Sequence, residues 1–155
     1  MDKVNIFLSY AREDAEYKKQ IDMALVGLKK SNKVNVWHDQ QIMASTVWSD
    51  EIKKAINEAH IFLLLISVDF NNSEYIWKNE LAIAMQKHQE GKARVIPIIC
   101  RTCDWTSMPY AKFQAIPPGV VPIDQFANKD EAYTIIAKQV KGVVDFIIEQ
   151  SKINP

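Results

Sequence analysis

A single carboxylate, Glu80, is the residue of this sequence whose placement most suggests chemistry. It lies in the segment SEYIWKNELAIAM, whose second half has the apolar spacing of a helix. The very apolar run IFLLLIS precedes this segment. Glu80 is therefore either a solvated helix residue, as most glutamates are, or a carboxylate held at the mouth of a pocket. Trp77, one turn earlier, lies on roughly the same side of the helix and is either core or a wall of that pocket.

Further polar and aromatic residues follow the predicted strands and are expected at the same edge of the sheet. In open parallel sheets, ligands bind beyond the carboxyl ends of the strands. The residues delivered there are Ser9, Tyr10, Arg12, Glu13, Trp37, His38, Asp39, Ser67, Asp69, Phe70, Arg101, Cys103, Asp104 and Trp105. These hydroxyls, carboxylates, guanidinium groups and aromatic faces could together hold a polar ligand with flat rings.

Several familiar kinds of site are excluded by what the chain lacks. It has 4 glycines, well separated in sequence, so neither a GxGxxG fingerprint nor a P-loop is present. A nucleotide would have to be held by side chains and helix ends, and classical dehydrogenase or NTPase chemistry is not expected. No serine lies in a G-x-S-x-G motif, which argues against a hydrolase of that type.

Two cysteines, Cys100 and Cys103, form a CxxC at the end of a predicted strand rather than at the start of a helix. No second pair exists for zinc, and the three histidines lack metal-ligand spacing, so no metal site is expected. The scarcity of cysteine favours a reducing cytoplasm. The zero formal net charge gives no support to a nucleic-acid or membrane partner, and the apolar runs are too short to span a bilayer.

The elements that must position these residues alternate between strand and helix. Short apolar runs predict strands over residues 4–10, 34–39, 61–67, 93–100 and 120–123. Helical patterns cover residues 15–30, 49–59, the segment of Trp77 and Glu80 as far as Gly91, and 131–149, and VDFNNS is a predicted loop. This alternation predicts an α/β, flavodoxin-like three-layer fold with a five-stranded parallel sheet, ordered 2-1-3-4-5, and helices on both faces. Residues 1–150 are expected to form one domain, and residues 151–155 a tail where a linker to another domain could begin.

The ordered set of these segments resembles Toll/interleukin-1 receptor (TIR) domains, most closely the bacterial NAD-cleaving type. VNIFLSYAREDAEYKKQI is similar to the family's first strand and turn. VWHDQQIMASTVWSDEIKKAINEAHIFLLLIS is similar to its second strand, BB loop, second helix and third strand, although the loop lacks the glycine common in the family. SEYIWKNELAIAM is similar to the segment that carries the catalytic glutamate, and RVIPIICRTCDW and IDQFANKDEAY also resemble bacterial members.

The resemblance implies cleavage of the bond between nicotinamide and ribose in NAD+, with Glu80 as the catalytic residue and NAD+ as substrate rather than cofactor. Nicotinamide in NAD+ is already a cationic pyridinium and leaves as a neutral base, so no second carboxylate is needed as a general acid. A partly buried carboxylate would stabilise the positive charge that develops on the ribose and orient its hydroxyls.

The same resemblance suggests roles for six further residues in binding the substrate. Trp77 would wall the ribose pocket, Tyr10 and Trp48 would stack on a ring, and Ser9 and Arg12 would contact ribose or phosphate. Asp39 would meet a ribose hydroxyl or cap the next turn, Trp48 could instead pack against the second helix, and Arg12 could pair with Glu13.

Three functions are consistent with these residues. The first is an NAD+ glycohydrolase in bacterial antiviral defence, activated by self-association through TIR–TIR contacts and joined to a fused or associated sensor domain, with linear or cyclic ADP-ribose as the second product. The second is a non-enzymatic TIR scaffold that signals by homotypic contacts. The third is a nucleoside-processing transferase, which a nucleoside screen would distinguish from the first.

Overall fold

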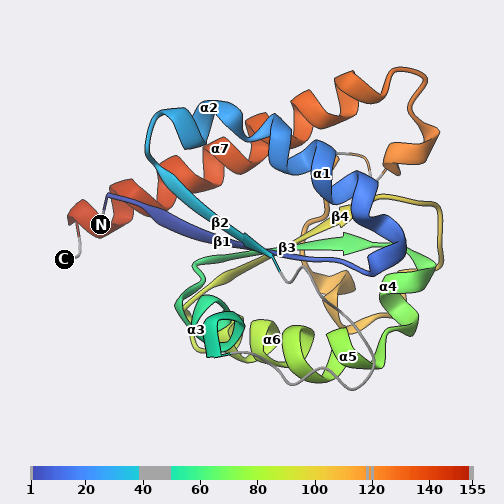
Figure 1. Ribbon diagram of the computed structural model, residues 1–155, viewed down its shortest axis with the longest axis horizontal. Coiled ribbons are helices and arrows are strands. Elements are labelled where there is room, and N and C mark those ends of the chain that lie inside the picture. The colour runs from blue at the N-terminus through green and yellow to red at the C-terminus, as the bar shows by residue number, and fades with distance from the viewer. Residues whose placement is uncertain (1, 39–49, 118, 120, 154–155) are drawn as a thin grey trace.

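A computed structural model describes residues 2–38, 50–117, 119 and 121–153. Its strands form one parallel sheet in the order β2-β1-β3-β4. The four strands are β1 (Val4–Ser9), β2 (Val34–His38), β3 (Ile61–Ile66) and β4 (Arg94–Ile99). Helices cover both faces of this sheet (Figure 1). The predicted α/β fold with a parallel sheet between two helical layers is confirmed.

The two helical layers contain different parts of the chain (Figure 1). One face carries α1 (Ala15–Ala24), α2 (Val26–Lys30) and the long α7 (Lys129–Ile153). The other carries α3 (Asp50–Glu58), α5 (Glu74–Ile76) and α6 (Ala82–Gln89), with the π-helical segment η2 (Trp77–Leu81) joining the last two. The short helix α4 (Val68–Asn72) follows β3 directly, where the sequence predicted a loop.

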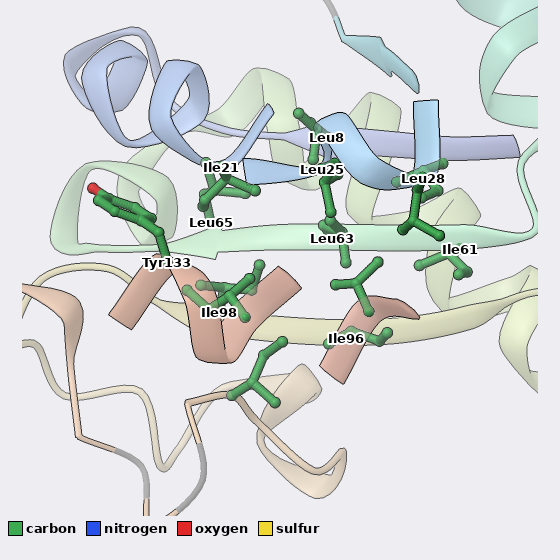
Figure 2. Packing of buried hydrophobic residues seen from close by; sticks show 14 of the residues in the cluster. Leu8, Ile21, Leu25, Leu28, Ile61, Leu63, Leu65, Ile96, Ile98 and Tyr133 are labelled. Carbon is green, nitrogen blue, oxygen red and sulfur yellow. The ribbon is translucent and has the colours of Figure 1, made fainter. Parts of the chain in front are cut away.

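Strand side chains alternate between two cores because successive residues of a strand point to opposite faces. In β3, Ile61, Leu63 and Leu65 pack toward α1, α2 and α7, as Figure 2 shows, whereas Phe62 and Leu64 pack on the opposite face. All six residues of β3 are buried. A strand covered on both faces needs no polar positions, which explains its continuous apolar sequence.

The predicted fifth strand is wrong. Of the range 120–123, the described residues precede or begin a 3-10 helix, η5 (Ile123–Gln125). Apart from the ladder with β3, the described residues form one isolated bridge to β4, between Ile98 and Ile116. The Ile116 N–H donates to the Pro97 carbonyl at 2.9 Å, and the Ile99 N–H donates to the Ile116 carbonyl at 3.1 Å. Two prolines follow in the sequence, Pro117 and Pro118, and a proline nitrogen has no hydrogen to donate to a ladder.

The predicted helix over residues 15–30 is two helices that are separated at Leu25. The Leu25 N–H is shared between the carbonyls of Ile21 and Asp22, each 3.2 Å away. The second helix ends where predicted because Asn32 takes a left-handed conformation, with φ 61°. The Lys33 N–H then donates to the Leu28 carbonyl at 3.1 Å and leads the chain into β2.

Candidate active site

Glu80 is a buried carboxylate at the carboxyl end of β1. The Ser9 hydroxyl donates a hydrogen bond of 2.6 Å to Glu80 Oε1. Both residues are only 1% exposed. Ser9 lies two residues after Phe7, so its side chain points to the same face of the sheet, which is the face covered by α5 and α6. The central strand of the sheet thus delivers a hydroxyl to the carboxylate, and Glu80 is not the solvated helix residue of the first alternative.

The backbone around Glu80 is a π turn, in which the Ala82 N–H donates to the Trp77 carbonyl five residues earlier. Ile76 before this turn and Leu81 within it are buried together with Glu80. A π turn contains one more residue than an α turn, so it brings the adjacent side chains of Glu80 and Leu81 to the buried side together. Single π turns inside helices are frequent at functional sites.

Trp77 and Tyr10, two of the predicted substrate contacts, are both largely withdrawn from solvent. Trp77 is half-buried and packs against the core on the α5 and α6 face. Its indole Nε1 is buried and has no hydrogen-bond partner among the described residues. Tyr10 is 7% exposed and packs in the opposite core, with its ring edge-on to His38 and the Lys18 ammonium 5.6 Å from its centroid. Ser9 and Tyr10, although adjacent in sequence, therefore point to different faces.

Arg12 is exposed in the 3-10 helix η1 (Arg12–Asp14). It lines a cavity of about 270 Å³ together with Ala11, Glu13, Asp69, Asn72 and Ser73. This cavity lies between the segment after β1 and helix α4, where the sequence predicted a binding edge. Arg12 and Glu13, both within the described ranges, do not form an ion pair with each other. The other two predicted contacts, Asp39 and Trp48, lie outside the described residues.

A partly buried ionic cluster at the same edge of the sheet was not predicted. Its centre is Asp14, which is 1% exposed. The Ser67 hydroxyl donates to Asp14 Oδ2, and Arg101 Nε donates to Asp14 Oδ1 at 2.8 Å. Arg101 also donates to the Asp69 carboxylate. The cluster could have been predicted from the positions of its residues in the sequence, because they all follow the ends of the adjacent strands β1, β3 and β4.

The cluster fixes the segments that surround the site. Ser67 also caps α4, accepting a hydrogen bond from the Phe70 N–H at 3.1 Å. Hydrogen bonds to Asp14 and Asp69 raise the pKa of Arg101, so its guanidinium stays charged. One side chain thereby ties together η1, α4 and the end of β4. Arg101 is committed to these partners rather than to a ligand.

The two cysteines are unpaired thiols in a setting that disfavours thiolate. Cys100 is fully buried, and burial raises the pKa of its thiol well above the ordinary value. Burial also raises the pKa of the half-buried Cys103, whose sulfur lies 3.9 Å from Asn71 Nδ2. A high thiol pKa works against nucleophilic or redox chemistry. Within the described ranges no cluster of three or more His, Cys, Asp or Glu is arranged to hold a metal ion.

Comparison with known proteins gives a family match that covers most of the chain. A model of the TIR domain family matches residues 6–136. An uncharacterized protein of Sinorhizobium fredii (strain NBRC 101917 / NGR234), y4lF, is 39% identical over 137 residues. That alignment covers 88% of this chain and 42% of the relative, so the chain spans less than half of the relative's length.

Among solved structures, the TIR domains of the activated Roq1 resistosome, which directly recognizes the pathogen effector XopQ, have a similar fold. The TM-score is 0.52 at 20% sequence identity, over 67% of this chain and 61% of that chain. At this identity the similarity concerns the fold. No helix in the described part of this chain is long and apolar enough to cross a membrane.

Proposed function

This chain belongs to the TIR domain family, and from that premise we propose that it is an NAD+ nucleosidase with Glu80 as its catalytic residue. The products are nicotinamide and ADP-ribose, in linear or cyclic form. The family is shown by the match over residues 6–136. The activity is our inference from the site.

One observation carries the proposal: Glu80 is a carboxylate that is 1% exposed, yet it lies at the edge of the sheet where ligands of this fold class bind. Burying a charged carboxylate costs free energy unless it is hydrogen-bonded, and the Ser9 hydroxyl donates to Glu80 Oε1 at 2.6 Å. Such a costly placement is typical of a functional carboxylate.

One carboxylate is enough for this chemistry because the nicotinamide of NAD+ is already cationic and leaves without being protonated. As the glycosidic bond breaks, the electron pair moves to the pyridinium nitrogen and positive charge develops on the ribose. A fixed negative charge in a water-poor setting stabilises that charge strongly. Water then adds to the anomeric carbon and loses a proton to give linear ADP-ribose, or an atom of the same molecule adds there to give the cyclic form. The buried indole N–H of Trp77, one turn before Glu80, is a donor available to a ribose oxygen. Exposed Arg12, across the cavity beside α4, is suited to the pyrophosphate.

We further propose that the active form is a self-assembled one and that the chain acts in the cytoplasm in bacterial antiviral defence. The resemblance to enzymatic TIR domains supports this, since in them the BB loop of one copy completes the pocket of its neighbour. The resistosome that contains the similar TIR domains is itself an assembly. The partial coverage of the longer relative is consistent with a fused sensor domain.

The test is incubation of concentrated protein with NAD+, with nicotinamide release followed by chromatography. Glu80→Gln keeps the shape of the side chain and removes its charge, and we expect turnover to fall on the order of 10²–10³-fold. Glu74→Gln is the matched control, because Glu74 is an exposed glutamate on α5, and it should retain wild-type turnover.

Two results would refute the assignment. Folded Glu80→Gln protein with wild-type turnover would exclude Glu80 as the catalytic residue. Wild-type protein that self-associates but releases no nicotinamide at any concentration would instead be a TIR scaffold that signals through contacts alone.

A further inference from the structure

We propose that Ser9 is a positioning residue that holds the Glu80 carboxylate in its reactive orientation, rather than a group that binds substrate. This inference rests on the proposed function and deepens it. It also revises the role that the sequence suggested for Ser9, which was contact with ribose or phosphate.

The first argument is burial and geometry. Ser9 and Glu80 are each 1% exposed, and the Ser9 hydroxyl faces the carboxylate inside the protein. A hydroxyl has one proton to donate, and that proton is directed to Glu80 Oε1 at 2.6 Å. This distance lies within the range of O–H···O⁻ hydrogen bonds to ionised acceptors, which are the stronger ones. The Ser9 donor is therefore already used on the carboxylate before any ligand arrives.

The second argument is the difference in rigidity between the two partners. Ser9 is the last residue of β1, and β1 has β2 on one side and β3 on the other. It is in register with Leu64 of β3, inside the sheet. Glu80 has a long side chain and lies in a π turn, where the regular helical hydrogen bonding is interrupted. The strand thus provides the fixed point, and the hydrogen bond transmits that position to a side chain with several rotatable bonds.

Catalysis would depend on this contact because the carboxylate must face the anomeric carbon closely and in one orientation. Small displacements of a reacting group lower the rate far more than they lower affinity. Loss of the Ser9 hydroxyl should therefore lower kcat and leave KM nearly unchanged. A residue that binds the substrate would show the opposite pattern, with a raised KM.

The experiment compares Ser9→Ala, Ser9→Cys and Ser9→Thr with the wild type in the nicotinamide-release assay. We expect kcat on the order of 10–100-fold lower for Ser9→Ala, with KM close to the wild-type value. Ser9→Cys keeps the shape but donates poorly, so it should also be slow. Ser9→Thr keeps the hydroxyl and should recover most of the rate. Ser31→Ala removes a hydroxyl that donates to the Gly27 carbonyl far from the site and should have no effect on turnover.

A double-mutant cycle then tests whether Ser9 acts through Glu80. Adding Ser9→Ala to Glu80→Gln should lower the residual rate no further, whereas independent effects would multiply. An unchanged kcat in folded Ser9→Ala protein would overturn the inference. A raised KM at constant kcat, or multiplying effects in the cycle, would do the same.

The same cycle in urea unfolding separates this inference from the proposed function, because it needs no activity. Suppose that the wild type does not cleave NAD+ but that the midpoint shift of the double variant differs from the sum of the two single shifts. The proposed function then fails, while the contact between Ser9 and Glu80 is confirmed. If the midpoints shift additively, the Ser9–Glu80 contact does not hold the side chain and the inference fails, whatever the activity.

Discussion

Asp14 shows how one buried charge can organise a rim of polar residues. Its side chain is fully buried, and its two oxygens accept from different donors, Arg101 Nε on Oδ1 and the Ser67 hydroxyl on Oδ2. A buried carboxylate is tolerated when its charge is paired and its lone pairs are used. Asp14 and Glu80 are thus two buried carboxylates at the same edge of the sheet, and a guanidinium balances the charge of Asp14.

Asp14→Asn tests this structural role. The substitution keeps the size of the side chain but removes the charge that faces Arg101, so we expect the free energy of unfolding to fall by roughly 1.5–3 kcal/mol. Urea unfolding followed by circular dichroism measures it. Asp22→Asn is the control, because the Asp22–Lys29 pair is partly exposed and should be worth less than about 1 kcal/mol. Equal effects of the two substitutions would mean that the cluster adds nothing beyond a surface ion pair.

Among the elements, α3 is joined to α6 by hydrogen bonds from Lys87. Lys87 of α6 is 9% exposed, and its ammonium donates to the carbonyls of Ile56, Asn57 and Ala59 at the end of α3. The distances to the Ile56 and Ala59 carbonyls are 3.3 and 2.9 Å. A cation at a helix C-terminus satisfies carbonyls that have no helical partner. Lys87 thus joins the helix after the predicted BB loop to the helix that continues from Glu80.

Lys87→Met should weaken this junction, because it removes the donors and leaves the carbonyls of α3 without them. We expect the free energy of unfolding at neutral pH to fall by roughly 1–2 kcal/mol, as measured in urea. Lys138→Met, at an exposed position of α7, serves as the control and should have little effect. A loss no larger than that of the control would contradict the role of Lys87 as a cap.

The wild type and Lys87→Met should also differ in how their stability depends on pH. Burial lowers the pKa of Lys87 below its ordinary value of 10.5. Between the two values the unfolded chain binds the proton more strongly, so the wild type gains stability relative to Lys87→Met as pH rises toward 10.5. Burial raises the pKa of Tyr110 and Tyr133, which lowers stability in alkali, but both proteins share that loss. A constant difference in melting temperature across this range would contradict the expectation.

For the whole molecule, the proposal requires that activity depend on assembly. Enzymatic TIR domains resemble one another in completing the pocket with a neighbouring copy, so an isolated copy should be slow. We expect nicotinamide release per molecule to rise with protein concentration, in parallel with the assembled fraction measured by light scattering. Turnover per molecule that stays constant while the assembled fraction changes would show that one copy is sufficient.

Much of the architecture could be predicted from the spacing of apolar residues, because that spacing reflects which side of each strand or helix is buried. The run IFLLLI is apolar at every position since β3 is covered on both faces, and the four strands β1 to β4 were each predicted to within one residue at either end. The predicted fifth strand was wrong. VVPI has the composition of a strand, but a strand forms only where a neighbouring strand can pair with it. The two prolines before VVPI, Pro117 and Pro118, cannot donate to a ladder, and no pattern within VVPI shows that.

The candidate site was likewise predictable in part from the sequence. The sequence by itself determined the alternation of the four strands with the main helices, the edge where polar residues collect, and Glu80 as the candidate carboxylate. Only the tertiary structure decided that Ser9 donates to Glu80 across 71 residues of sequence, that Asp14 is buried against Arg101, and that Tyr10 points away from Ser9. Periodicity reports which face of an element is buried, whereas a contact between distant residues depends on sheet register and on how the crossovers pack.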